Sequence, residues 1–151
     1  MTDKTKIYKL SVSDIVRLYL GTTLPEQKTL DRGTTEHEQN GYDNKKIYER
    51  YYIIDLDNII CIRGIPDKID PPYVIEFKTT TKKNLEDIVN YAELQLQLYL
   101  WLTGLPKGRV DVYISDTKKL VKGYRYVNYS EALTKNIIIR AYKKLKTLEE
   151  P

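Results

Sequence analysis

The stretch Tyr73–Thr79, YVIEFKT, decides the fold and the site expected for this chain. Its β-branched and aromatic residues predict a β-strand. Glu76 and Lys78 are two positions apart, and alternate residues of a strand project from the same face, so their charged ends can converge on one point. Because burying charges in an apolar strand costs free energy unless they are paired or bind a metal ion, this strand is a candidate functional element.

A second carboxylate, Asp67, lies nine positions before Glu76, just after the bend at residues 64–66. A hairpin could return Glu76 close beside it. Two neighbouring carboxylates repel each other unless a proton or a cation lies between them, and their oxygen atoms suit Mg²⁺ or Mn²⁺. A Glu-x-Lys strand alone is more often structural, and an Asp after a proline is usually a turn residue. The joint pattern leaves a metal site and a purely structural arrangement both open.

The flanking sequence predicts a mixed α/β domain with a central mixed sheet of about four to five strands between helices. Further strands are expected at 48–56, 59–65, 109–115 and 120–127, and helices at 11–20, from 33–34 onward, at 84–103 and at 130–148. The helix at 84–103 is apolar nearly all round, so we expect it to be covered on more than one face. Since there is no repeat and no Gly/Ser-rich linker, residues 1–151 are expected to form a single domain.

The composition narrows the class of protein. No apolar run approaches the roughly 20 residues of a membrane span, so no membrane role is expected. Neither a secretory signal nor a disulfide framework is expected, because the first residues are polar and Cys61 is the single cysteine, and this favours an intracellular, cytoplasmic protein. The net charge of +4 permits nucleic-acid binding, although charge alone favours a solvated surface. Lysines recur near the candidate strand, at positions 78, 82, 83, 118, 119 and 122.

Five short motifs follow one another along the chain. They are LSVS at Leu10–Ser13, GTTEH at Gly33–His37, G-x-x-D at Gly64–Asp67, E-x-K at Glu76–Lys78 and QLQLY at Gln95–Tyr99. With these motifs in this order, the sequence resembles the PD-(D/E)xK nuclease superfamily. It looks most like the RecB-like branch, which includes exonucleases associated with CRISPR spacer acquisition. The resemblance covers residues 10 to 99 and implies a restriction-endonuclease-like core.

The resemblance also implies roles for the motif residues. Asp67, Glu76 and Lys78 would be catalytic. His37, Asp67 and Glu76 would hold Mg²⁺ or Mn²⁺, helped by the backbone carbonyl of Phe77, and Lys78 would position the attacking water or stabilise charge on the phosphate. His37 is the only histidine in the chain, which gives its place in the motif more weight.

The later helix motif extends the expected site. Gln95 and Tyr99 are one helical turn apart and share a face, so both could reach the strand that bears Glu76 and Lys78. The resemblance implies a supporting or DNA-contacting role for them. A core helix with a tyrosine at its edge is the other interpretation.

Several members of the branch hold an iron–sulfur cluster with four cysteines, which this chain lacks, so no cluster is expected. The expected function is a divalent-metal-dependent DNA nuclease that hydrolyses phosphodiester bonds in replication, recombination or repair, as an exonuclease on single-stranded or free DNA ends. The alternatives are a structure-specific endonuclease similar to Holliday-junction resolvases, a non-catalytic nucleic-acid-binding subunit, and a small interaction protein with accidental motifs. DNA is the expected partner, and a homodimer or higher oligomer is left open. The abundance of Lys, Ile and Tyr hints at a thermophilic archaeon or its virus.

Overall fold

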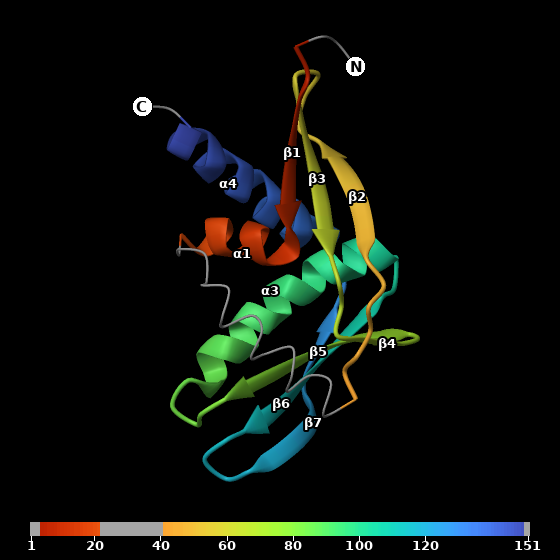
Figure 1. Cartoon of the computed structure of the whole chain (residues 1–151), viewed down its shortest axis with the longest axis vertical. Helices are drawn as coiled ribbons and strands as arrows, with labels where there is room; N and C mark the ends of the chain where they lie inside the picture. The colour runs from red at the N-terminus through yellow and green to blue at the C-terminus, as the bar shows by residue number, and fades with distance from the viewer. Residues whose placement is uncertain (1–3, 22–40, 150–151) are drawn as a thin grey trace.

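The computed structural model describes residues 4–21 and 41–149 of the chain (Figure 1). Helices flank β-sheets in it, so the predicted mixed α/β class is confirmed. The described elements are β1 (Lys6–Ser11), α1 (Val12–Leu20), β2 (Tyr48–Ile53), β3 (Asn58–Gly64), β4 (Lys68–Asp70), β5 (Tyr73–Thr80), α3 (Leu85–Thr103), β6 (Lys107–Ile114), β7 (Lys119–Asn128) and α4 (Glu131–Glu149). The second helix expected from residues 33–34 lies outside the described residues.

The described strands divide between two mixed sheets. One has four strands in the order β4-β5-β6-β7, with β5 and β6 parallel, and it is a mixed sheet of the expected size. The strands expected at 48–56 and 59–65 form as β2 and β3, but they lie in the other sheet and not in this one. The other has the order β1-β3-β2, with β1 parallel to β3 and β2 antiparallel to it. The chain passes from one sheet to the other between Gly64 and Lys68, where Pro66 cannot donate a ladder hydrogen bond. Strand β1 was not predicted, because its six residues end where the capping serines of α1 begin.

Helix α1 begins at a capping box formed by Ser11 and Asp14. The Ser11 side chain accepts a hydrogen bond from the Asp14 N–H (3.0 Å), and the Asp14 carboxylate accepts one from the Ser11 N–H (3.1 Å). The helix ends at Gly21, which has the left-handed conformation (φ 79°). The cap fixes where α1 begins, and therefore which of its residues face inward.

Helix α3 is the centre of the molecule. It contacts β5, β6 and β7 of the four-stranded sheet, and it also contacts β2 and both of the other described helices, α1 and α4. Figure 1 shows α3 crossing the four-stranded sheet, with the three-stranded sheet above it in this view. The prediction that this helix is covered on more than one face is confirmed. Two glutamines, Gln95 and Gln97, are buried on it together with its apolar residues.

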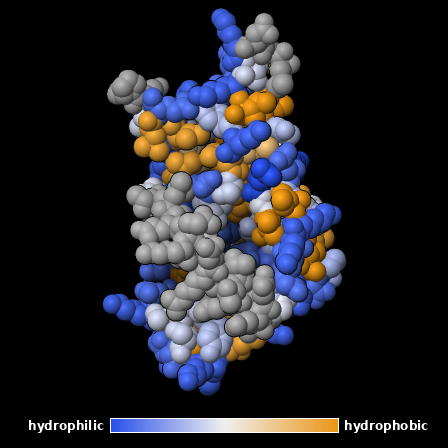
Figure 2. All heavy atoms as spheres, viewed as in Figure 1, coloured by the Kyte–Doolittle hydropathy of each residue, from blue (hydrophilic) through white to orange (hydrophobic). Residues whose placement is uncertain are grey.

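The surface is mixed in character. On the face seen in Figure 2, hydrophobic patches are interrupted by hydrophilic atoms, and the lower end of the molecule is mainly hydrophilic. Ile53 and Leu56, at the end of β2 and in the following turn, are among the exposed hydrophobic residues. None of the described helices is long and apolar enough to cross a membrane.

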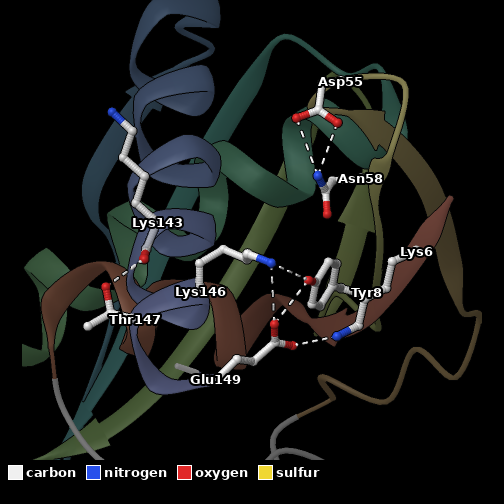
Figure 3. Close-up of polar contacts among 8 residues, drawn as sticks. All are labelled: Lys6, Tyr8, Asp55, Asn58, Lys143, Lys146, Thr147 and Glu149. Carbon is white, nitrogen blue, oxygen red and sulfur yellow. Dashed lines mark hydrogen bonds and ion pairs between the residues drawn. The ribbon is translucent and has the colours of Figure 1, made fainter. Parts of the chain in front are cut away.

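Polar contacts join the last turns of α4 to β1 (Figure 3). Glu149 accepts from the Lys6 ammonium (2.9 Å) and from the Tyr8 hydroxyl (3.2 Å), and Lys146 donates to the Tyr8 hydroxyl (3.4 Å). Ion pairs as solvated as these add little net stability. Their contribution is to join the end of α4 to β1, while the rest of α4 packs against α1 and α3.

Candidate active site

Strand β5 separates two environments. Glu76 and Lys78 project from the face that packs against α3, and Ile75 and Phe77 project from the opposite face. The Phe77 ring stacks on Tyr42 with centroids 4.4 Å apart. Because β5 lies between β4 and β6, Glu76 is in the interior of the sheet and is only 3% exposed. The alternation along YVIEFKT therefore gives the arrangement that the sequence predicts.

The structure brings Asp67 beside Glu76. Asp67 precedes β4, which pairs with β5, and its carboxylate accepts a hydrogen bond from the Phe77 N–H (2.7 Å). Burial raises the pKa of Glu76 well above its ordinary value, and the negative charge of Asp67 raises it further, while the Lys78 ammonium, 3.5 Å away, opposes the rise. A carboxyl group in such surroundings retains a proton unless a cation compensates its charge.

These carboxylates fit a divalent cation. Glu76 Oε1 is buried and has no hydrogen-bond partner, although it lies beside a second carboxylate. Hard cations such as Mg²⁺ and Mn²⁺ take ligands of this kind. Within residues 4–21 and 41–149, no group of three or more His, Cys, Asp or Glu side chains could hold a metal ion. The third side chain of the expected set, His37, lies outside these ranges.

Helix α3 places Tyr99 and Gln95 at the same centre. Burial raises the pKa of Tyr99 well above its ordinary value, and the charges of Glu76 and Asp67 add to this effect, so the phenol lies within their electrostatic reach. Gln95 donates to the Ser13 hydroxyl (3.4 Å), and its own Oε1 is buried without a partner. The helix motif and the serine motif therefore meet close to β5.

Gly64 explains why these motifs occur together. A Cβ atom at this position would lie 2.7 Å from Tyr99 Cε1 and 2.7 Å from Val12 Cγ2, closer than Cβ atoms approach other heavy atoms. Only glycine therefore lets the end of β3 pass between α1 and α3. Tyr99 of the later helix motif can pack here only because the G-x-x-D motif has a glycine at position 64.

We expect Gly64→Ala to lower the free energy of unfolding by about 1–3 kcal/mol, because the added methyl group overpacks a closed interface. Denaturant titration measures this loss. Val12→Ala in the same chain removes one of the two clashing atoms, so the double variant should lose less than the sum of the single losses. Strict additivity of the two losses would contradict this account of Gly64.

Two further residues lie at the centre and were not predicted. The Lys78 ammonium is 5.2 Å from the centroid of the Tyr91 ring, and the Arg17 guanidinium is 5.8 Å from the centroid of the same ring. Tyr91 lies four positions before Gln95, and Arg17 lies four positions after Ser13. Each of them lies one helical turn from a motif residue on the same helix face, and this spacing could have identified them from the sequence.

Unpartnered polar atoms gather around this centre. Within the described part of the chain, the buried side-chain nitrogen and oxygen atoms without a hydrogen-bond partner are Arg17 Nη1, Glu76 Oε1, Tyr91 OH and Gln95 Oε1. They come from α1, β5 and α3. Glu76 and Tyr91 both contact Lys78. Arg17 contacts Tyr91, and Gln95 lies one helical turn from Tyr91. Buried polar groups in native proteins are nearly always satisfied. The arrangement is therefore suited to a polar or charged ligand.

No protein-family model matches the sequence, and no curated protein matches it. Several solved structures are similar to it, including the following three. One is SSO0001, with a TM-score of 0.63 at 21% identity over 97% of this chain and 79% of that one. Another is the exonuclease LHK-Exo of Laribacter hongkongensis in complex with dAMP, with 0.60 at 16% identity over 93% and 88%. The third is a phage-related exonuclease from Haemophilus somnus 129PT, with 0.56 at 16% identity over 91% and 80%.

At these identities the similarity shows a shared fold. The chain has the restriction-endonuclease-like fold of phage-related and alkaline exonucleases, as the sequence predicts. The RecB-like branch, which the motifs favoured, stays a prediction.

Proposed function

We propose that the chain is a divalent-metal-dependent nuclease that hydrolyses DNA phosphodiester bonds, acting as an exonuclease on single-stranded or free ends. The observation that carries the proposal is the gathering of unpartnered buried polar atoms around Asp67, Glu76 and Lys78. The fold, shared with proteins named as exonucleases, supports it and favours exonucleolytic over endonucleolytic cleavage.

Each residue of the centre has a role that its surroundings support. Asp67 and Glu76 would hold Mg²⁺ or Mn²⁺ together with the Phe77 backbone carbonyl and His37. The bound ion supplies a lowered water pKa and positive charge at the phosphate oxygens. The Lys78 ammonium group lies on the same face of β5 as Glu76, where it would stabilise the negative charge that develops on the phosphate.

The helix residues complete the centre. Tyr99 keeps its phenolic proton, because its pKa is raised well above the ordinary value, and so it adds no negative charge beside the two carboxylates. Gln95 joins α3 to α1 through Ser13, which fixes the face on which Tyr99 and Tyr91 lie. We assign both Gln95 and Tyr99 a supporting or DNA-contacting role, and their burial favours the supporting one.

The test is cleavage of end-labelled single-stranded, double-stranded and branched DNA with Mg²⁺, with Mn²⁺ or with a chelator. We expect mononucleotides and short products from linear single strands in the presence of either metal. Retained cleavage in the chelator would contradict the metal site. Preferred cleavage of the branched substrate by a dimer would favour a resolvase-like endonuclease instead.

Lys78→Met is expected to lower kcat about a hundredfold, because it removes one preorganised charge from the reacting phosphate while retaining an apolar stem against Tyr91. The rise of the rate with pH should also move to higher pH, since Lys78 lowers the pKa of Glu76. Steady-state kinetics over a pH series measure both effects. Lys78→Arg keeps the charge and should retain the wild-type pH profile, and an unshifted profile for Lys78→Met would contradict the role given to Lys78.

A further inference from the structure

One end of the four-stranded sheet carries much of the positive charge. We define the basic tip as residues 79–84, where β5 leads into α3, and residues 114–122, where β6 turns into β7. It contains five lysines and one acidic residue, Asp116, so its net charge equals the +4 of the whole chain. The lysines, at positions 82, 83, 118, 119 and 122, are all exposed.

Hydrogen bonds hold the two segments of the basic tip together. The Ser115 N–H donates to the Thr80 carbonyl (2.9 Å), and the Lys82 N–H donates to the Asp116 carboxylate (3.1 Å). Asp116 therefore has a backbone partner. None of the five lysines forms an ion pair with another described residue. The tip is thus a fixed pair of loops with uncompensated ammonium groups.

The basic tip continues directly from the catalytic strand. In the register of the sheet, Lys78 lies beside Val112, which lies beside Val121, and Thr80 lies beside Ile114. At roughly 3.3 Å per residue, the tip begins about 3.3 Å beyond Lys78 along β5. Figure 1 shows the two loops together at the lower left of the molecule, and the same region of Figure 2 is mainly hydrophilic.

We propose that the basic tip binds the phosphates of the nucleic-acid strand that follow the reacting phosphate. The inference rests on the proposed function and names the surface along which the substrate lies. A single strand has a negative charge at every nucleotide, and the tip presents several exposed lysines, without ion-pair partners among the described residues, within a few residues of the reacting centre. A longer substrate therefore gains binding energy that a mononucleotide ester does not.

The experiment compares two triple variants that lose the same charge. K82Q/K83Q/K119Q alters the basic tip, and K9Q/K135Q/K143Q alters exposed lysines on β1 and α4. Binding of a fluorescent 20-nucleotide single strand is measured by anisotropy in a chelator over a series of salt concentrations. We expect the tip variant to lose about 2 from the slope of log K against log salt and to bind about ten- to a hundredfold more weakly at 0.1 M salt. The control variant should follow the wild type.

Cleavage provides a second, independent measurement. The tip variant should show a raised KM on the 20-nucleotide strand with kcat unchanged, and unchanged hydrolysis of a thymidine 5′-nitrophenyl phosphate. Equal binding slopes for the two triple variants would overturn the inference. Retention on immobilised polyglutamate tests the other occupant. A tip variant that loses this retention but still binds DNA like the wild type would also overturn the inference, because an acidic protein would then be the partner. If the wild type cleaves neither substrate but the tip variant still loses DNA binding, the proposed nuclease fails and the DNA surface stands.

Discussion

Glu76→Gln is expected to abolish DNA cleavage and at the same time to stabilise the metal-free protein. Glutamine keeps the shape of the side chain but is a poor ligand for a hard cation, so the stabilisation that the metal gives the transition state is lost. A metal ion contributes several kcal/mol of transition-state stabilisation, and each step of about 1.4 kcal/mol changes the rate tenfold. We therefore expect the cleavage rate to fall about a thousandfold. The same change removes a buried charge that has one oxygen unpartnered and a second carboxylate beside it.

The stabilisation should depend on pH. Because burial and Asp67 raise the pKa of Glu76, the folded protein binds this proton more tightly than the unfolded chain. The wild type must therefore lose stability as the pH rises from the ordinary carboxyl range, near 4.5, through the raised pKa of Glu76. Glu76→Gln lacks this loss, so its advantage is absent below pH 4.5 and grows across that interval.

Thermal unfolding in a chelator, followed from pH 4 to pH 9, measures this difference. Glu131→Gln, at an exposed position on α4, serves as the matched control and should follow the wild-type curve. In a second series, with Mn²⁺ in place of the chelator, the Tm of the wild type and of the control should rise but that of Glu76→Gln should not. A Glu76→Gln protein that is less stable than the wild type at pH 8, or that still cleaves DNA, would rule out the proposed site.

Asp111→Asn is expected to have the opposite effect, with a loss of about 3 kcal/mol of stability and no change in kcat. Asp111 is fully buried in β6, on the Tyr42 side of the sheet. It accepts from Arg109 twice (2.8 Å each), from the Tyr42 hydroxyl (2.7 Å) and from the Gly123 N–H (2.7 Å). Removing one partner of a buried ion pair costs about 3–5 kcal/mol of stability. Because Arg109 retains some solvent contact, we expect the loss for Asp111→Asn to lie at the lower end of this range.

The pH dependence of Asp111 has the reverse sign to that of Glu76. Burial raises the pKa of Asp111, but the hydrogen bonds from Arg109, Gly123 and Tyr42 outweigh burial and lower it below 3.8. Its contribution to stability is therefore present above the carboxyl range and is lost as the pH falls through the lowered pKa. Urea titration at pH 7 measures the loss, and Tyr42→Phe should cost about 1 kcal/mol for one hydrogen bond. A loss below 1 kcal/mol for Asp111→Asn would contradict this account.

Sequence patterns identified most of the candidate site because its residues lie at fixed intervals on regular elements. Glu76 and Lys78 share a strand face, and Gln95 and Tyr99 share a helix face, so spacing alone places each pair. The nearness of Asp67 to Glu76 depended on a hairpin, which the structure forms through β4. His37 stays a prediction.

The parts that the sequence did not reveal depend on contacts between elements. Asp111 looked like an ordinary polar residue of a strand, because its partners Tyr42 and Gly123 lie elsewhere in the chain. The pairing of β1 with β3 joins segments more than fifty positions apart, and no local pattern records it. Arg17 became a candidate only once α1 was seen packed beside Tyr91. Spacing along the sequence predicts which side chains share a face of one helix or strand. It does not predict which other elements these side chains contact, because that depends on tertiary packing.

The contact between β1 and α4 has a consequence for biosynthesis. Lys6 and Glu149 are 143 positions apart, and α1 packs on α4, so the part of α1 that α4 covers stays exposed until residues 131–149 have been translated. A ribosome-bound chain that already contains β5 and α3 would still lack the helix that holds α1 against them. If the chain is the proposed nuclease, the nascent polypeptide would contain both carboxylates before α4 had fixed α1 beside them, and DNA cleavage would begin only once α4 had folded.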